Sequence, residues 1–213
     1  MTRRLSALVL TVLIAAALAP ASPVVADKGI FIGLGLTGLK GTGLGNAWNV
    51  KTGMLGGFAL TLGFSDVFSL QPEIYFIQKG AVSESRGSGG ILRSTMDIGV
   101  LQVPLLAKLS LKLGDSYIRP YVIGGASADV KIYANLSTIL DDGSSYETQI
   151  SDATVEGLHP VTFSWIGGAG VDFRSPEGRL TAEIRYSRTF GSITKEGAAV
   201  FATALSISLG YYF

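Results

Sequence analysis

The final stretch of the chain, FATALSISLGYYF at residues 201–213, decides the fold. Large apolar residues occupy most of its odd-numbered positions, whereas the even-numbered positions carry mainly alanine, serine and glycine. Because successive side chains of a β-strand point to opposite faces, this alternation predicts a strand with one apolar face and one face of small residues. The segment is longer than the roughly 9–11 residues that a strand needs to cross the hydrocarbon core of a membrane.

The same alternation recurs upstream, which predicts eight strands in all. The seven other segments are residues 30–38, 58–64, 70–77, 101–109, 118–131, 163–173 and 180–187. The mean hydropathy is +0.41 with only 15% charged residues, yet the apolar run at the N-terminus falls short of the roughly 20 residues of a spanning helix, and no later run comes near that length. A closed barrel also satisfies every backbone group in lipid. We therefore expect an all-β fold, a single eight-stranded antiparallel up-and-down transmembrane β-barrel.

The N-terminus predicts export. Two arginines, Arg3 and Arg4, precede an apolar run from Ala7 to Ala19, and Pro20 leads into small residues that end at Ala26. This order predicts a signal peptide over residues 1–26 and a barrel domain over residues 27–213. The sequence has no cysteine, which excludes lipid anchoring, disulfides and thiolate metal sites. Without Arg3 and Arg4 the chain is close to neutral, so no basic excess favours nucleic acid.

The connections between the predicted strands alternate in length. Short turns are expected at residues 65–66, 114–115 and 174–178, which are rich in turn-forming residues. The other connections are long, over residues 39–52, 80–94, 133–160 and 190–198. Outer-membrane barrels have short periplasmic turns and long external loops, so we expect both termini in the periplasm.

Several short motifs carry a resemblance to a known family. They are QPEIY at 71–75, QKGA at 78–81, VPLLAK at 103–108, RPY at 119–121, GGAGV at 167–171, EIRY at 183–186 and GYYF at 210–213. In this order they resemble the porin-family (PorT-like) outer-membrane β-barrel proteins of Gram-negative bacteria, with a longer third loop here. The resemblance implies the barrel fold but no shared reaction. It also implies that Leu209, Tyr211 and Phe213 form an aromatic-terminated signal for the barrel-assembly machinery.

Charged residues in the strands share the parity opposite to the large apolar residues. They are Glu73, Lys79, Lys108, Arg119, Asp129, Lys131, Asp172, Glu183 and Arg185. The interior of an eight-stranded barrel is just wide enough to be filled by side chains, so these charges are expected to pair in a structural network. Lys108 and Arg119 are candidate partners for the pair of residues 183 and 185. A narrow ion path along the network is the alternative, and acid–base chemistry by two of the carboxylates is less favoured.

Two further motifs have competing interpretations. Residues 33–38, GLGLTG, match a dinucleotide-binding pattern, but that pattern needs a helix next, and the glycines that follow favour a strand running into a loop. Asp141-Asp142-Gly143 lacks the other positions of a calcium loop and is better interpreted as a hairpin turn. A ribbon extending beyond the membrane would make the third loop a contact surface.

The single histidine, His159, raises an enzymatic alternative. Outer-membrane lipid hydrolases and acyltransferases use a histidine with a serine, and Ser164 or the pair Ser144-Ser145 are candidates. A triad also needs an orienting acid, which the sequence does not identify, so a solvated loop histidine is favoured.

We therefore expect a non-enzymatic integral outer-membrane protein, an anchor or scaffold whose outer loops meet the exterior. No cofactor or metal is expected. The expected partners are outer-membrane lipids and, during biogenesis, the barrel-assembly machinery, with the protein as a monomer. A small passive pore, a lipid-modifying enzyme and a soluble lipocalin-like barrel with its apolar face inward are the alternatives.

Overall fold

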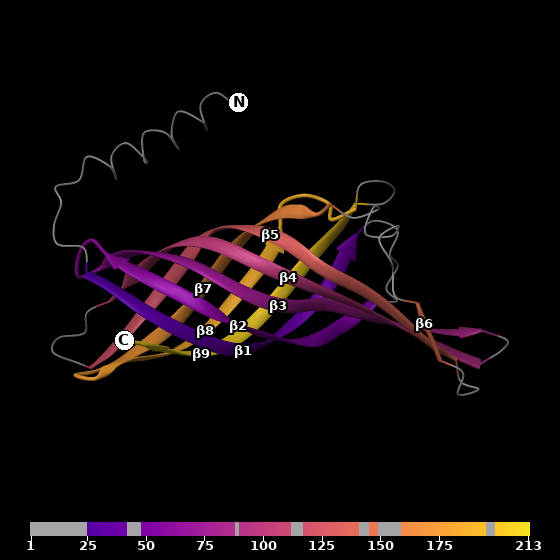
Figure 1. Cartoon of the computed structure of the whole chain (residues 1–213), viewed down its shortest axis with the longest axis horizontal. Helices are drawn as coiled ribbons and strands as arrows, with labels where there is room; N and C mark the ends of the chain where they lie inside the picture. The colour runs from indigo at the N-terminus through magenta and orange to yellow at the C-terminus, as the bar shows by residue number, and fades with distance from the viewer. Residues whose placement is uncertain are drawn as a thin grey trace, which may run out of the picture.

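The computed structural model describes residues 25–41, 48–87, 90–111, 117–140, 145–148, 159–194 and 199–213 (Figure 1). Its strands are β1 (Val25–Gly41), β2 (Trp48–Gly63), β3 (Phe68–Gly87), β4 (Gly90–Ser110), β5 (Ile118–Leu140), β6 (Ser145–Thr148), β7 (Val161–Ser175), β8 (Gly178–Thr189) and β9 (Val200–Tyr212). Within these residues no helix has the length and hydropathy that a membrane span requires. The predicted signal peptide lies almost wholly outside them.

Eight of the strands close into an antiparallel barrel, as predicted. The order is β4-β3-β2-β1-β9-β8-β7-β5, and β4 also pairs with β5. The seam between the first and last strands runs from Gly29 opposite Tyr212 to Gly41 opposite Val200. Beyond it, the backbone of Phe213 exchanges two hydrogen bonds with Lys28. The remaining strand, β6, pairs only with the end of β5.

The two faces of the barrel are assigned as the alternation predicts. On β9, Ile207 and Leu209 are more than 60% exposed, whereas Ser206 and Ser208 are buried inside. The charged side chains Lys108 and Asp172 are almost completely buried. The alternative of a soluble barrel with its apolar face inward is therefore wrong.

The seam depends on a glycine. Gly29 lies directly opposite Tyr212 across the seam, and a Cβ atom at this position would overlap the tyrosine ring. Tyr121 covers Gly170 in the same way on the far side of the barrel. An aromatic ring laid over a glycine covers backbone that has no side chain of its own. Both positions therefore need glycine because of a close approach.

Two of the predicted loops contain long stretches of strand. Residues 80–94 form a hairpin, with β3 and β4 paired up to Gly87 and Gly90. In the third connection, β5 continues to Leu140, paired with β4, and then with β6 across the predicted Asp141–Gly143 turn, which lies outside the described residues. Backbone pairing therefore continues beyond the stretches in which the sequence alternates. This β3–β6 ribbon projects from one end of the barrel (Figure 1).

The opposite end carries the short turns. The amides of Phe64 and Ser65 both donate to the carbonyl of Phe68, and Ser175 pairs with Gly178, whose φ is +157°. The turn expected at residues 114–115 lies outside the described part of the chain. The C-terminus lies at this same end (Figure 1), which is the periplasmic end in outer-membrane barrels.

Candidate functional site

The outer level of the interior is organised around the Asp129 carboxylate on β5. The Nζ atom of Lys79 lies 3.1 Å from one carboxylate oxygen. Gln102 donates a hydrogen bond of 2.6 Å to the other oxygen, and the hydroxyls of Ser127 and Ser164 donate at 2.7 and 2.6 Å. All of these side chains are buried. A buried carboxylate is tolerated when it is paired and hydrogen-bonded in this way.

The middle level is organised around Arg185 on β8. Its two terminal nitrogens donate to the two oxygens of Glu73 at 2.5 and 2.7 Å, and its Nε donates to Glu183. Tyr121 donates to the second oxygen of Glu183 at 2.8 Å. Gln71 donates at 2.6 Å to a Glu73 oxygen that also accepts from Arg185. The two-pronged contact with Glu73 is the strong geometry of an arginine–carboxylate pair.

The periplasmic level joins Lys108, Asp172 and Arg179. Lys108 Nζ lies 2.9 Å from both oxygens of Asp172 and 3.6 Å from the centre of the Tyr121 ring. Arg179 pairs with Asp27 at 3.2 Å and reaches Asp172 at 3.7 Å. It also donates to the hydroxyl of Thr61 at 3.0 Å.

These ion pairs run across the lumen. Glu73 and Arg185 belong to β3 and β8, which three other strands separate in either direction round the barrel. Lys108 on β4 and Asp172 on β7 are separated by β5. Pairs between strands that are not neighbours place their side chains in the space between the walls. The interior is therefore crossed by ion pairs, which lie beside an apolar cluster that includes Phe31 and Ile77.

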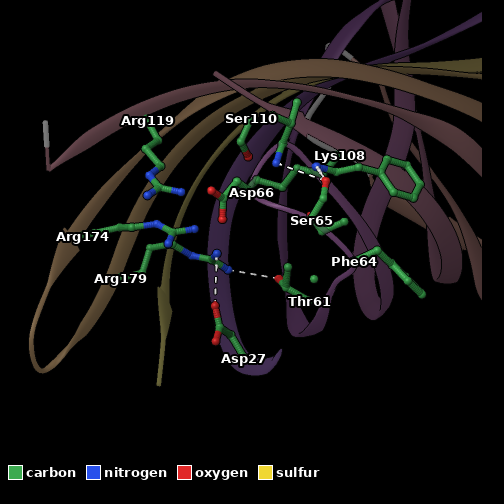
Figure 2. A pocket seen from close by; sticks show the side chains of 14 residues that line it. Asp27, Thr61, Phe64, Ser65, Asp66, Lys108, Ser110, Arg119, Arg174 and Arg179 are labelled. Atoms are coloured by element: carbon green, nitrogen blue, oxygen red, sulfur yellow. Dashed lines mark hydrogen bonds and ion pairs between the residues drawn. The ribbon is translucent and has the colours of Figure 1, made fainter. Parts of the chain in front are cut away.

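A cavity of about 300 Å³ lies below the lowest level, at the periplasmic mouth. Figure 2 shows the guanidinium groups of Arg119, Arg174 and Arg179 extending from one wall toward Asp66, on the turn between β2 and β3. Lys108 and Asp27 also line it. The cavity is lined by four cationic side chains and two carboxylates.

At the outer end, Ile193, in the connection between β8 and β9, lies inside the lumen. Ile193 is 2% exposed and belongs to the main apolar cluster of the interior. Its amide donates to the carbonyl of Val200. Its own carbonyl accepts hydrogen bonds from the amide of His159 and from Lys131 Nζ, at 2.8 and 3.2 Å. Lys131 also donates to the His159 carbonyl at 2.5 Å, so it ties two outer connections together.

The structure brings together most of the charged residues singled out from the sequence, but not with the expected partners. The residues that share ion pairs are Glu73, Lys79, Lys108, Asp129, Asp172, Glu183 and Arg185. Lys108 pairs with Asp172 rather than with residue 183. Arg119 stands apart, half-buried at the mouth, and has no ion pair with a carboxylate among the described residues. Lys131 contacts backbone carbonyls.

The sequence analysis missed Arg179 and Asp27. Arg179 has the inward parity of Glu183, but it directly follows the turn that ends at Gly178 and was not counted with the strand. Asp27 shares the inward parity of Phe31 on β1. Extending the predicted segment 30–38 by three residues and the segment 180–187 by one residue, each toward the N-terminus, would have found both.

Of the residues of the enzymatic alternative, the two with described side chains, His159 and Ser164, do not meet. His159 is exposed, and its imidazole makes no hydrogen bond with a described serine or carboxylate. Ser164 is fully buried and donates to Asp129. The side chains of residues 144 and 145 lie outside the described part. No group of three or more metal-ligating side chains occurs among the described residues.

The remaining motifs lie in strands. Residues 33–38 belong to β1, so the glycine pattern is part of a strand and is not followed by a helix. Leu209, Tyr211 and Phe213 point outward at the periplasmic end, and the rings of Tyr211 and Phe213 are 6.3 Å apart. Their role as an assembly signal remains a prediction.

Several solved structures are similar to this chain. Among solved structures, Neisserial surface protein A is similar at 14% identity and a TM-score of 0.48, over 89% of this chain and 99% of that one. Ail, the attachment invasion locus protein of Yersinia pestis, has 15% identity and a TM-score of 0.43, over 88% and 99%. The outer membrane enzyme PagL has 12% identity and a TM-score of 0.32, over 86% and 98%.

No protein with a curated function matches the sequence significantly. A family model described as "Outer membrane protein beta-barrel domain" matches residues 27–195, which is most of the chain. The finer resemblance to PorT-like proteins remains a prediction. The protein belongs to the outer membrane β-barrel domain family.

Proposed function

We propose that this protein is a non-enzymatic scaffold of the bacterial outer membrane, whose filled barrel anchors an external β-ribbon. The observation that carries the proposal is the occupied lumen. Arg185 bridges β8 and β3 through Glu73 in the middle of the barrel, and Ile193 closes the apolar outer end. A lumen crossed by buried ion pairs at several levels leaves no continuous water path.

The β3–β6 ribbon is the part proposed to act. Strand pairing continues past the membrane to Gly87 and Gly90 in one hairpin and to Leu140 in the next. A paired ribbon holds its residues in a fixed arrangement at low entropic cost on binding, since the backbone is already ordered. The proposed scaffold is a monomer in outer-membrane lipids, inserted by the barrel-assembly machinery.

Single-channel recording in planar bilayers tests the scaffold against a passive pore. The purified wild-type barrel is expected to give no steady current at any holding potential that the bilayer withstands. Folding in the same sample is checked by the shift in gel mobility on boiling. A steady, reproducible conductance from the folded protein would contradict the proposal and favour the pore.

The surroundings of the candidate serine, Ser164, support the proposal that the protein is not an enzyme. Ser164 is buried and its hydroxyl is engaged by Asp129, so it is closed to a lipid substrate. His159→Ala and wild-type protein are expected to behave alike in an assay of acyl release from lipopolysaccharide and phospholipid. Acyl release by the wild type that is lost in His159→Ala would establish an enzyme instead.

A further inference from the structure

We propose that the cavity at the periplasmic mouth is a binding site for a phosphate-class oxyanion, held by Arg119, Arg174 and Arg179. This site lies at the end opposite the external ribbon, so it is a second function and does not depend on the scaffold proposal.

The charge of the cavity favours an anion. Lys108 already pairs with Asp172, and Arg179 pairs with Asp27 and reaches Asp172. The other carboxylate of the lining is Asp66, so Arg119 and Arg174 together face one acidic side chain. Neither arginine has an ion pair with a carboxylate among the described residues. In a cleft with protein walls the field of such charges is concentrated, which raises the local concentration of anions.

The strand register sets two of these arginines against each other. Arg174 on β7 is directly opposite Arg179 on β8, one position from the turn. Like charges directly opposite in an antiparallel pair are destabilising. Figure 2 shows both side chains reaching into the same space, with Arg119 beside them. An anion bound between the two guanidinium groups would attract both of them and so offset their mutual repulsion.

Arg179 also carries an unmade hydrogen bond. The residue is 5% exposed, yet its Nε atom is buried without a hydrogen-bond partner. Buried polar groups nearly always have a partner, and an unsatisfied charged group is the costly case. Its terminal nitrogens are used by Asp27 and Thr61. Because this atom is fully covered, it can meet a bound oxyanion only if the Arg179 side chain shifts toward the cavity.

The size and donor type identify the ligand class. Guanidinium groups match phosphate oxygens with parallel N–H donors. A volume of about 300 Å³ is at the small end of ligand pockets, which span roughly 300–1,000 Å³. The cavity therefore suits a phosphate or diphosphate group. Such groups reach this face as headgroups of the inner leaflet or as soluble phosphates.

The test measures binding of pyrophosphate by isothermal titration calorimetry to the folded full-length barrel in an uncharged detergent. Arg174→Gln and Arg119→Gln are each expected to weaken binding roughly ten- to hundred-fold, the value of one charge-assisted hydrogen bond. Arg93→Gln is the matched control, because Arg93 is an exposed arginine that pairs with Glu84. It is expected to leave binding unchanged.

A second arm identifies the source of the phosphate. The barrel is reconstituted with phosphatidylglycerol, exchanged into detergent, and assayed for retained lipid. Retention by the wild type and loss in Arg174→Gln assigns the site to a lipid headgroup, whereas pyrophosphate binding without retention assigns it to a soluble phosphate. Binding in neither arm, or equal binding by the wild type and the double variant of residues 119 and 174, overturns the proposal.

Stability supplies an independent readout. In anion-free buffer Arg174→Gln is expected to unfold at the same or a higher urea concentration than the wild type, because it removes the opposition with Arg179. Pyrophosphate is expected to raise the midpoint of the wild type but not that of the variant. A lower midpoint for Arg174→Gln in anion-free buffer would show that this arginine is a structural element and not part of an anion site.

Discussion

Replacing Arg185 with glutamine is expected to destabilise the barrel by about 3–5 kcal/mol, the cost of breaking a buried ion pair on one side. Glu73 and Glu183 are 4% and 6% exposed, and Arg185 is the cation that contacts both among the described residues. The substitution keeps a polar side chain but leaves two carboxylates facing each other in a dry interior. Tyr121 and Gln71 cannot compensate, since they donate hydrogen bonds without charge.

The measurement is urea unfolding of the barrel refolded in phosphatidylcholine vesicles, followed by the gel mobility of unboiled samples. Arg93→Gln is the control, because the Arg93–Glu84 pair is 3.7 Å apart with both side chains more than half exposed. A surface pair of this kind contributes only about 0–1 kcal/mol. Equal midpoints for the two variants would refute a central ionic network.

Three further predictions follow from the seam, the outer end and the last residue. Gly29→Leu is expected to lower the free energy of unfolding by about 1–3 kcal/mol, the usual cost of overpacking, because the leucine side chain meets the Tyr212 ring. An unchanged urea midpoint would contradict this. Ile193→Ala is expected to cost roughly 2–5 kcal/mol without producing a current in planar bilayers, since the ionic levels below remain. Deleting Phe213 is expected to lower the folded protein in the outer membrane while refolding in detergent persists, and normal levels in cells would disprove its role in assembly.

The eight-stranded barrel could be predicted because a membrane imposes its rule on every lipid-facing residue. Each strand that crosses the membrane must carry large apolar side chains at alternate positions. The alternation in residues 201–213 and 101–109 therefore predicts both a strand and the positions that face the lipid. The short turns could be predicted for a similar reason, because a connection of a few residues needs turn-forming residues such as Ser65 and Asp66. Outside the membrane the rule lapses, which is why residues 80–94 were expected to be a loop.

The partners of the interior charges could not be predicted. Alternation says that Lys108 and Glu183 point inward, but it does not say at which height along the axis each one lies. Height depends on the stagger between strands, which follows from the register of every pair around the barrel. Lys108 thus meets Asp172, and Arg185 meets Glu73, through a register that no single strand reveals. The cavity at the periplasmic mouth could not be predicted from the sequence either, because Arg174 was expected to lie in a turn and not in a strand.

The placement of the ion pairs links the interior to the seam. Arg185 reaches Glu73 only when β8 and β3 face each other across the lumen, and this requires β9 to pair with β1 between them. Before closure these charges would face lipid or water without their partners. After closure each one pairs with a side chain of opposite charge on the opposite wall. These ion pairs therefore stabilise the closed barrel and not an open sheet. A variant weakened at Gly29 and one weakened at Arg185 act on the same closing step, so their destabilisations should combine to less than their sum.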